Sequence, residues 1–414
     1  MKLDTPDAAG SRRDFAPAIA VGLLALAWAS VNAWLEQRGR VLPLDVDGWG
    51  HLVNRLQSSG HDWALLFREP SLWKGPVVPF IFGLCYYVAP WPESVLVLNA
   101  FAFALAAFVY CLAFQELGAT RWGAAAALVP AILYLPHRYV FGYYVAEPIY
   151  TLLAALLLWS VGRTARRGSL AGTFGCGVLA ALLLQARAPF VFVVAGLGLW
   201  LVLRLPRRRW TTAALYALGF LLAFAPWPVR NYLVEGELIP FTTEGGKILF
   251  QGTFLPGDDL TMNEIRKLPE FRRIEAGEEG LAAVDQYRYW KPLAIAQLRQ
   301  DPLAQIQLCV RKAARFWVYL PAHSWRPTWK TGFLAFLVLP LALVGLIRYR
   351  HSAWAQLSGL FVGGLWSFHT LVHTELRYNF PVLPTVFLLA VFGGTYLLSR
   401  IRVTIRTAIA VNAA

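Results

Sequence analysis

Long apolar stretches recur along this chain of 414 residues, and they limit the folds that it can adopt. Neither 15-FAPAIAVGLLALAWASVNAWL-35 nor 380-FPVLPTVFLLAVFGGTYLLS-399 contains a charged residue. A helix of about 20 apolar residues crosses the hydrocarbon core of a bilayer, which is about 30 Å thick. Only 15% of the residues are charged, whereas soluble domains carry about 25%. The sequence therefore predicts an integral membrane protein that crosses the bilayer several times.

We expect an all-α polytopic fold with about ten transmembrane helices, whose boundaries are uncertain by a few residues. The first span follows Arg12 and Arg13 as a signal peptide would, but its length favours an anchor that is not cleaved. The expected spans are 15–35, 94–115, 122–136, 148–162, 169–186, 189–205, 211–229, 332–347, 353–373 and 380–398.

The charged residues predict the orientation of these spans. With the N-terminus inside, the arginine clusters at 163–167 and 204–209 also lie inside, as the positive-inside rule requires. Of the 24 acidic residues, only Asp4, Asp7, Asp14 and Glu116 then fall on the inner side. The chemistry is therefore expected on the outer face, and we expect a bacterial inner membrane with a periplasmic active site.

The orientation divides the chain into three expected regions. Residues 1–229 form a transmembrane module with a long first outer loop (36–93), residues 230–331 form an outer segment, and residues 332–414 contain the last spans and a basic tail. The stretch 76–90 is too short and too rich in proline to cross, so we expect a helix at the outer membrane edge. The stretches 47–60 and 302–321 are likewise expected to be interfacial helices.

Neither the net charge of +14 nor the four cysteines indicate a different class of protein. The basic residues lie in short clusters between apolar segments, which fits membrane topology better than nucleic-acid binding. Cys85, Cys111, Cys176 and Cys309 lie far apart without zinc spacing, so we expect neither a disulfide framework nor a metal site. No phosphate-binding glycine motif appears, so nothing indicates nucleotide hydrolysis.

Four acidic or basic residues at the expected outer membrane edge are candidates for chemistry. Asp45 and Asp47 follow the first span, where a partly desolvated carboxylate can act as a general base or simply cap a helix. Lys74 precedes the 76–90 stretch and can bind a phosphate or extend to lipid headgroups. Glu147 opens a span from the outer side, where a helix N-terminus by itself stabilises an acid.

Three arginines lie at the outer ends of spans, against the positive-inside trend: Arg187, Arg230 and Arg377. A guanidinium group offers forked donors that match a phosphate and offset the charge of a departing one. The alternative is a structural ion pair with Glu147 or Glu375.

These blocks together resemble the GT-C superfamily, which includes protein O-mannosyltransferases, the lipid A aminoarabinose transferase and oligosaccharyltransferases. The first-loop blocks 45-DVDGW-49, 60-GHDW-63 and 74-KGPVVP-79 are similar to that family's loop with its acid and its lysine. Later blocks are also similar, namely 143-YYVAEPIY-150, 226-PWPVRNYLVEGELIPFTTEGG-246 and 375-ELRYNFPVLP-384. The chain departs from the family in its short outer segment and in Asp-Val-Asp where Asp-Glu is commoner.

The resemblance implies the GT-C fold and an inverting transfer of a sugar from a polyprenyl-phosphate donor to a hydroxyl or amine of a glycan, lipid or protein outside the membrane. Asp45 or Asp47 is then the base, with Glu147 as a further catalytic acid, and Lys74, Arg187, Arg230 and Arg377 bind the donor phosphate. Other residues in or beside these blocks are expected to bind substrate: Trp49, His51, His137, Arg138, Tyr143, Tyr144, Asn231, Tyr232, Glu375 and Tyr378. Members of the family differ in metal use, and without a ligand cluster we expect no metal and no other cofactor.

The competing hypothesis is a transporter or flippase for a polyprenyl-linked glycan, which would also use many helices and outer arginines. That class predicts charged groups near the middle of spans. Here the ionisable groups gather at span ends on one face, which favours an enzyme that takes its donor from the membrane. The expected partners are the donor, membrane lipids and the acceptor, and no nucleic acid.

Overall fold

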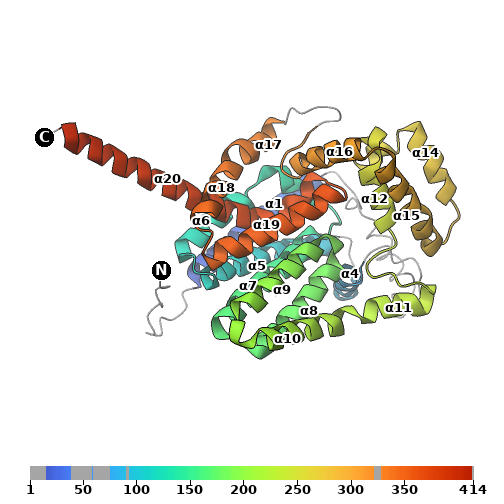
Figure 1. The fold of residues 1–414 in the computed structure, drawn as a ribbon, viewed down its shortest axis with the longest axis horizontal. Helices are drawn as coiled ribbons and strands as arrows, with labels where there is room; N and C mark the ends of the chain where they lie inside the picture. The colour runs from blue at the N-terminus through green and yellow to red at the C-terminus, as the bar shows by residue number, and fades with distance from the viewer. Residues whose placement is uncertain (1–14, 39–57, 59–74, 90–92, 321–327, 413–414) are drawn as a thin grey trace.

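The computed structural model describes residues 15–38, 58, 75–89, 93–320 and 328–412, and this part of the chain folds into helices without a β-strand. Figure 1 shows a bundle of long helices with a group of shorter helices at one end. The N-terminal part of the bundle contains α1 (Ala16–Gln37), α4 (Val77–Val88), α5 (Ser94–Glu116), α6 (Arg121–Ile132), η1 (Leu135–Gly142), α7 (Glu147–Arg167), α8 (Leu170–Ala186), η2 (Ala188–Phe190), α9 (Val191–Arg204), α10 (Arg209–Phe224) and α11 (Pro226–Glu235). The C-terminal part contains α17 (Trp329–Phe333), a π-helical turn at Leu334–Val338, α18 (Leu339–Arg348), α19 (Ala353–Leu371), η7 (Leu376–Val382) and α20 (Leu383–Asn412).

Six helical stretches in the described part are long and apolar enough to cross a membrane: Ala16–Gln37, Ser94–Glu116, Glu147–Arg167, Pro206–Glu235, Thr331–Arg348 and Leu376–Thr407. A seventh is counted if the bent pair α6 and η1 is one span. Two of the other expected spans correspond to shorter apolar helices, Leu170–Ala186 and Ala188–Arg204, and the third corresponds to α19. The chain is thus an integral membrane protein, and the total of about ten spans remains a prediction.

Glycines bring pairs of these helices into close contact, as is common in membranes, where small residues let backbones approach. A Cβ on Gly177 of α8 would lie 2.1 Å from the carbonyl oxygen of Tyr216 in α10, and one on Gly219 would lie 2.2 Å from that of Phe174. Gly345 and Gly393 make the same kind of close backbone contact between α18 and α20. The backbones of these helices therefore touch directly.

The group of shorter helices belongs to the segment 230–331 that the sequence predicts on the outer side, called the outer segment below, and it has a small apolar core of its own. It contains α12 (Gly245–Thr253), α13 (Met262–Ile265), α14 (Pro269–Glu275), α15 (Ala283–Gln300) and α16 (Pro302–Arg315). Its buried core residues are Phe250, Phe254, Ile265, Phe271, Trp290 and Ala294. Burying these side chains stabilises the segment as a unit that packs on the end of the bundle.

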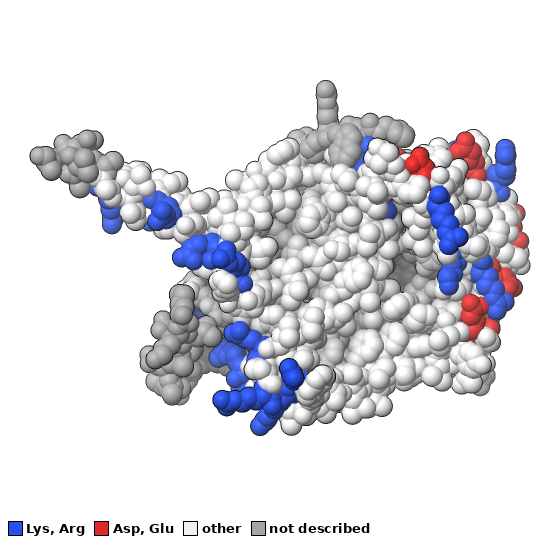
Figure 2. All heavy atoms as spheres, viewed as in Figure 1, with Lys and Arg blue, Asp and Glu red and all other residues white. Residues whose placement is uncertain are grey.

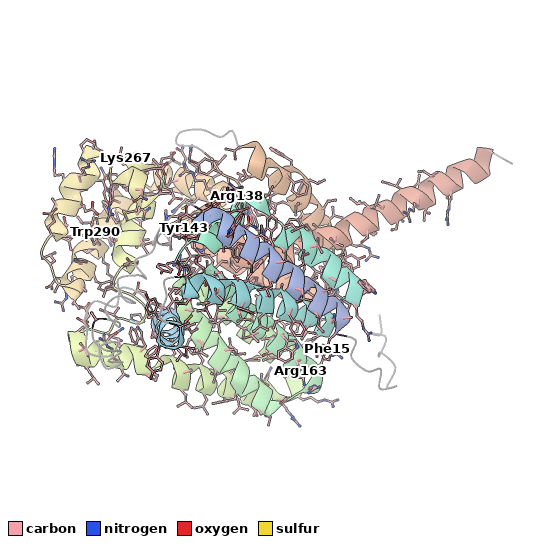
Figure 3. The ribbon with its side chains drawn as sticks, turned by 180° about the vertical axis from the view of Figure 1, so that it is seen from behind. Phe15, Arg138, Tyr143, Arg163, Lys267 and Trp290 are labelled. Atoms are coloured by element: carbon pink, nitrogen blue, oxygen red, sulfur yellow. The ribbon has the colours of Figure 1, made fainter. Side chains whose placement is uncertain are left out.

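Charged residues separate to the two ends of the molecule. Figure 2 shows Lys and Arg near the end of α10, both signs of charge over α14 and α15 at the opposite end, and a broad uncharged band between. In Figure 3, Phe15 and Arg163 lie at the first end, while Lys267 and Trp290 lie at the second. This distribution fits a membrane around the uncharged band, with the outer segment on one side and the basic loops on the other.

Candidate active site

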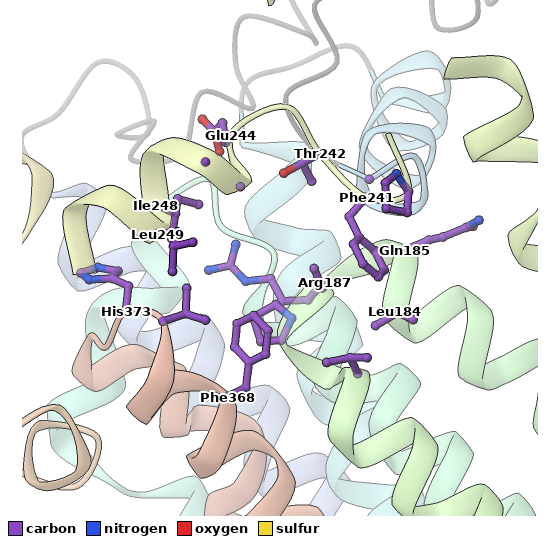
Figure 4. Close-up of a pocket in the computed structure, with 18 of the residues that line it drawn as sticks. Leu184, Gln185, Arg187, Phe241, Thr242, Glu244, Ile248, Leu249, Phe368 and His373 are labelled. Carbon is purple, nitrogen blue, oxygen red and sulfur yellow. The ribbon is translucent and has the colours of Figure 1, made fainter. Parts of the chain in front are cut away.

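A cavity of about 360 Å³ lies where the outer segment meets the ends of the membrane helices. Figure 4 shows its walls, which come from α8 and η2, from α12 and the loop before it, and from the end of α19. Its lining residues include Leu184, Gln185, Arg187, Trp227, Phe241, Thr242, Glu244, Ile248, Leu249, Tyr287, Lys291, Phe368, His369, His373 and Tyr378. A mostly apolar wall with a few converging polar groups is typical of a site for an amphiphilic ligand.

Arg187 provides a cation in this cavity. It caps the C-terminal end of α8, where Pro189 helps to end the helix and start η2. Its guanidinium carbon lies 5.1 Å from the ring centre of Tyr378 and 5.9 Å from that of Tyr150, and Figure 4 shows its side chain between the walls. Aromatic faces stabilise the cation and fix its direction. The Arg187 guanidinium is therefore positioned to bind an anionic group of a ligand in the cavity.

Arg377 precedes Tyr378 in the chain and belongs to a buried group of charged side chains. Its Nε donates to Oε2 of Glu375 at 2.7 Å, and its Nη1 lies 3.7 Å from Oε1 of Glu147. Glu147 is almost fully buried in the first turn of α7, where the helix dipole stabilises a carboxylate. The structure therefore brings together three residues that the sequence singled out, and the ion pairs considered for them are present.

A second acid–base pair, which sequence analysis missed, adjoins this group. The Nδ1 of His373 lies 2.6 Å from Oδ1 of Asp259, and its Nε2 lies 3.5 Å from Oε1 of Glu375. Burial lowers the pKa of His373, but the Asp259 carboxylate and the hydrogen bonds to Asp259 and Glu375 raise it further, to about 9. Burial also raises the pKa of Asp259 despite the opposing effect of His373. His373 is therefore a charged link between the outer segment and the Glu375–Arg377 pair.

Arg230 lies beside the cavity, on the same helix as Trp227. Its guanidinium carbon is 5.4 Å from the Trp227 ring centre, and its Nη1 donates to Asn231 and lies 3.8 Å from Oε1 of Glu235. Asn231 donates to the carbonyl of Ile239 at 2.8 Å, and Tyr232 points outward, with 58% of its surface exposed. These contacts explain how the loop after α11 is held.

The residues expected from the 137–148 block form a layer next to this site. His137 is buried, with Nε2 2.6 Å from Oδ1 of Asn379, and Asn379 donates to the carbonyl of Phe316. Arg138 pairs with Glu36 at 3.4 Å, which ties η1 to the C-terminal end of α1. Tyr143 and Tyr144 are partly buried against the main core.

The first-loop residues Asp45, Asp47, Trp49, His51 and Lys74 lie outside the described residues. Gly75 is described and lines the cavity, and a Cβ there would meet the carbonyl oxygen of Gln185 at 1.8 Å. Gly75, which belongs to the expected first loop, therefore lies in the wall of the cavity against the end of α8.

The part of the chain that the structure describes contains neither a metal cluster nor a disulfide. Among the described residues, no group of three or more His, Cys, Asp and Glu side chains could hold a metal ion. All four cysteines are free thiols. Metal independence remains a prediction.

Comparisons with known proteins give similarity at the level of structure and not of sequence family. No family model matches the chain, and no curated protein matches it. Among solved structures, the chain is similar to the crystal structure of ArnT from Cupriavidus metallidurans bound to undecaprenyl phosphate, with a TM-score of 0.41 and 14% sequence identity over 90% of this chain and 76% of that one. Because similarity at this level does not establish an activity, the functional interpretation depends on the residues of the site.

Proposed function

We propose that this protein is an inverting glycosyltransferase of the GT-C type, which moves a sugar from a polyprenyl-phosphate donor to an acceptor hydroxyl or amine on the outer, periplasmic side of a bacterial inner membrane. The observation that carries this proposal is the cavity at the junction of the membrane helices and the outer segment, with Arg187 held between aromatic rings. Apolar walls suit the first isoprene units of a lipid donor, and a forked cation suits its phosphate.

The charges around the cavity suit a departing phosphate. Sugar transfer forms a bond from the acceptor oxygen or nitrogen to the anomeric carbon and breaks the bond from that carbon to the phosphate oxygen, which leaves with the electron pair. Arg187 would neutralise the developing charge, and Arg377 is the chain neighbour of Tyr378, which lines the cavity. Cations fixed before the reaction stabilise such a transition state without reorganising.

The acceptor proton requires a base. The first-loop carboxylates Asp45 and Asp47 are the proposed bases, because a lipid-borne anomeric carbon and an aqueous acceptor can meet only at the outer membrane edge. Glu147 is the alternative carboxylate. Its contact with Arg377 and its burial at the start of α7 suit it better to fixing Arg377 than to meeting an acceptor.

Lipid binding tests the phosphate part of the proposal. The protein in nanodiscs should bind undecaprenyl phosphate more tightly than undecaprenol, and Arg187→Ala should weaken phosphate binding by about tenfold to a hundredfold, the value of a charged hydrogen bond of about 1.5–3 kcal/mol. The control is Arg288→Ala, which removes an exposed arginine that pairs with Glu237 and should leave binding unchanged. Equal binding of the two lipids, or unchanged affinity in Arg187→Ala, would contradict the proposal.

The same lipid-binding measurement tells which of the other proposed ligands bind the phosphate and which only form ion pairs within the protein. Lys74→Ala, Arg230→Ala and Arg377→Ala should each weaken binding of undecaprenyl phosphate by a similar factor. A variant with normal affinity assigns its residue to structural ion pairing instead.

A further inference from the structure

Helix α16 (Pro302–Arg315) buries its charged face in the protein. Arg311, Lys312 and Arg315 are all less than 10% exposed. The Nε of Arg311 lies 3.0 Å from Oδ2 of Asp258, and Nη2 of Arg315 lies 3.4 Å from the same oxygen. Lys312 donates to the carbonyls of Gly252, Leu371 and Val372 at 3.0–3.2 Å. The charges are therefore used to fix the helix in place.

The opposite face of α16 is apolar and exposed. Leu303, Ile306 and Val310 are 67%, 61% and 57% exposed, at positions i, i+3 and i+7 of one helical stripe. In water a surface helix has the reverse arrangement, with apolar residues inward and charges outward. No described residue covers this stripe, and its exposed side chains suit an apolar environment.

Other helices of the outer segment expose charged residues. On α14 and α15, Arg272, Arg273, Asp285 and Arg288 are exposed, and Figure 2 shows charges of both signs over these helices. The segment thus has a charged side and an apolar side, and the apolar side is that of α16.

The apolar side of α16 continues toward the start of a candidate membrane span, which also exposes apolar side chains. The chain after α16 hydrogen-bonds to the start of the span Thr331–Arg348, because the Tyr319 amide donates to Oγ1 of Thr331 and the Thr328 amide donates to the Tyr319 carbonyl. That span exposes Phe333 and Phe336 by 52% and 74%. On the other side, the Trp366 indole of α19 donates to the Ala313 carbonyl of α16 at 2.9 Å. Tryptophan in such a position is typical of a membrane–water interface.

We propose that α16 is a membrane-contacting helix, whose Leu303–Ile306–Val310 stripe lies among phospholipid acyl chains of the leaflet nearest the outer segment. The ion pairs to Asp258 hold the stripe outward, and the hydrogen bonds of Lys312 fix α16 to the end of α19. The outer segment then rests on the bilayer beside the cavity. This inference does not depend on the proposed transfer reaction.

Photocrosslinking in a phospholipid nanodisc tests the inference. p-Benzoylphenylalanine replaces Leu303, Ile306 or Val310 in the full chain, one at a time, and intact mass reveals phospholipid adducts after illumination. Adducts are expected at all three positions. The positive control is the same substitution at Phe336 in the span, and the negative controls are the substitutions at Arg272 and Arg288, which should give none.

Three results would overturn the inference: no adduct at Ile306 and Val310 while Phe336 gives one, equal adduct yields at Arg272 and Arg288, or crosslinks from the stripe to a second protein chain. Only variants that elute as monodisperse particles are compared. Because the three stripe positions are substituted separately, misfolding of one variant leaves two independent measurements.

Discussion

At the residue scale, sequence analysis identified the site residues that are unusual at the end of a membrane span. It missed the residues whose role depends on a contact with a residue far away in the sequence. Arg187 and Arg377 were found because arginine is unexpected at the outer end of a span. Asp259 and His373 were missed because their contact joins residues 114 positions apart, and no local spacing reports such a contact. The acids at 257-GDD-259 after a proline and the histidine just before 375-ELR-377 were the available signals.

The His373–Asp259 pair should make stability depend on pH. The pKa of His373 is raised from 6.5 to about 9 in the folded protein, so the pair stabilises the fold fully below pH 6.5 and progressively less as the pH rises through 9. The melting temperature in detergent should therefore fall between pH 6.5 and 9, and His373→Gln should flatten that slope. His351→Gln, at an exposed position, is the control and should keep it. Identical slopes in His373→Gln and the parent protein would show that the histidine is not charged.

At the element scale, hydropathy predicted where most of the helices lie but not which helices touch. Helices are present at the ten expected spans and at 76–90 and 302–321, whereas the expected helix 47–60 lies outside the described residues except for position 58. Helix pairing, however, depends on glycines whose neighbours are distant in sequence, as between α8 and α10. The helix expected at 302–321 forms as α16 over Pro302–Arg315. Its orientation, with charges inward, could not be predicted because the partner acid Asp258 lies in another part of the outer segment.

A matched pair of glycine variants tests the contact between α8 and α10. Gly177→Ala puts a methyl group 2.1 Å from a backbone oxygen, so the helices must separate, and we expect a loss of about 1–3 kcal/mol of stability. Gly175→Ala lies in the same helix with no atom within 4 Å and should be neutral or slightly stabilising, since alanine favours helix over glycine. Thermal unfolding in detergent measures both, and an equal effect of the two substitutions would contradict close packing.

At the scale of the whole molecule, the membrane orientation depends on whether the 76–90 segment crosses. The helix there, α4, has 12 residues, which span about 18 Å, less than the hydrocarbon core of about 30 Å. Its first residues pack near the end of α8, because Gly75 meets Gln185. Both observations favour a helix that does not cross, although its place relative to a bilayer remains a prediction.

Cysteine labelling in intact cells tests this orientation. Thr120→Cys and Ala165→Cys should stay unlabelled by a membrane-impermeant maleimide until the membrane is permeabilised, because the start of α6 and the end of α7 are expected inside. Arg272→Cys, on the exposed surface of α14, should be labelled at once. The parent protein with its four native cysteines gives the background. Labelling of position 120 or 165 in intact cells would reverse the topology and move the cavity to the inner side.

The proposed reaction is tested most directly by the lipids of cells that lack this protein. Such cells should accumulate one polyprenyl-phosphate sugar, detected by mass spectrometry, because the donor is no longer consumed. Wild-type protein and Asp47→Asn, which keeps a helix-capping side chain, should clear the lipid. Asp45→Asn should not, because it removes the proposed base while preserving size and hydrogen bonding. No accumulated polyprenyl-phosphate sugar, or its complete clearance by Asp45→Asn and Asp47→Asn alike, would contradict sugar transfer by a first-loop carboxylate.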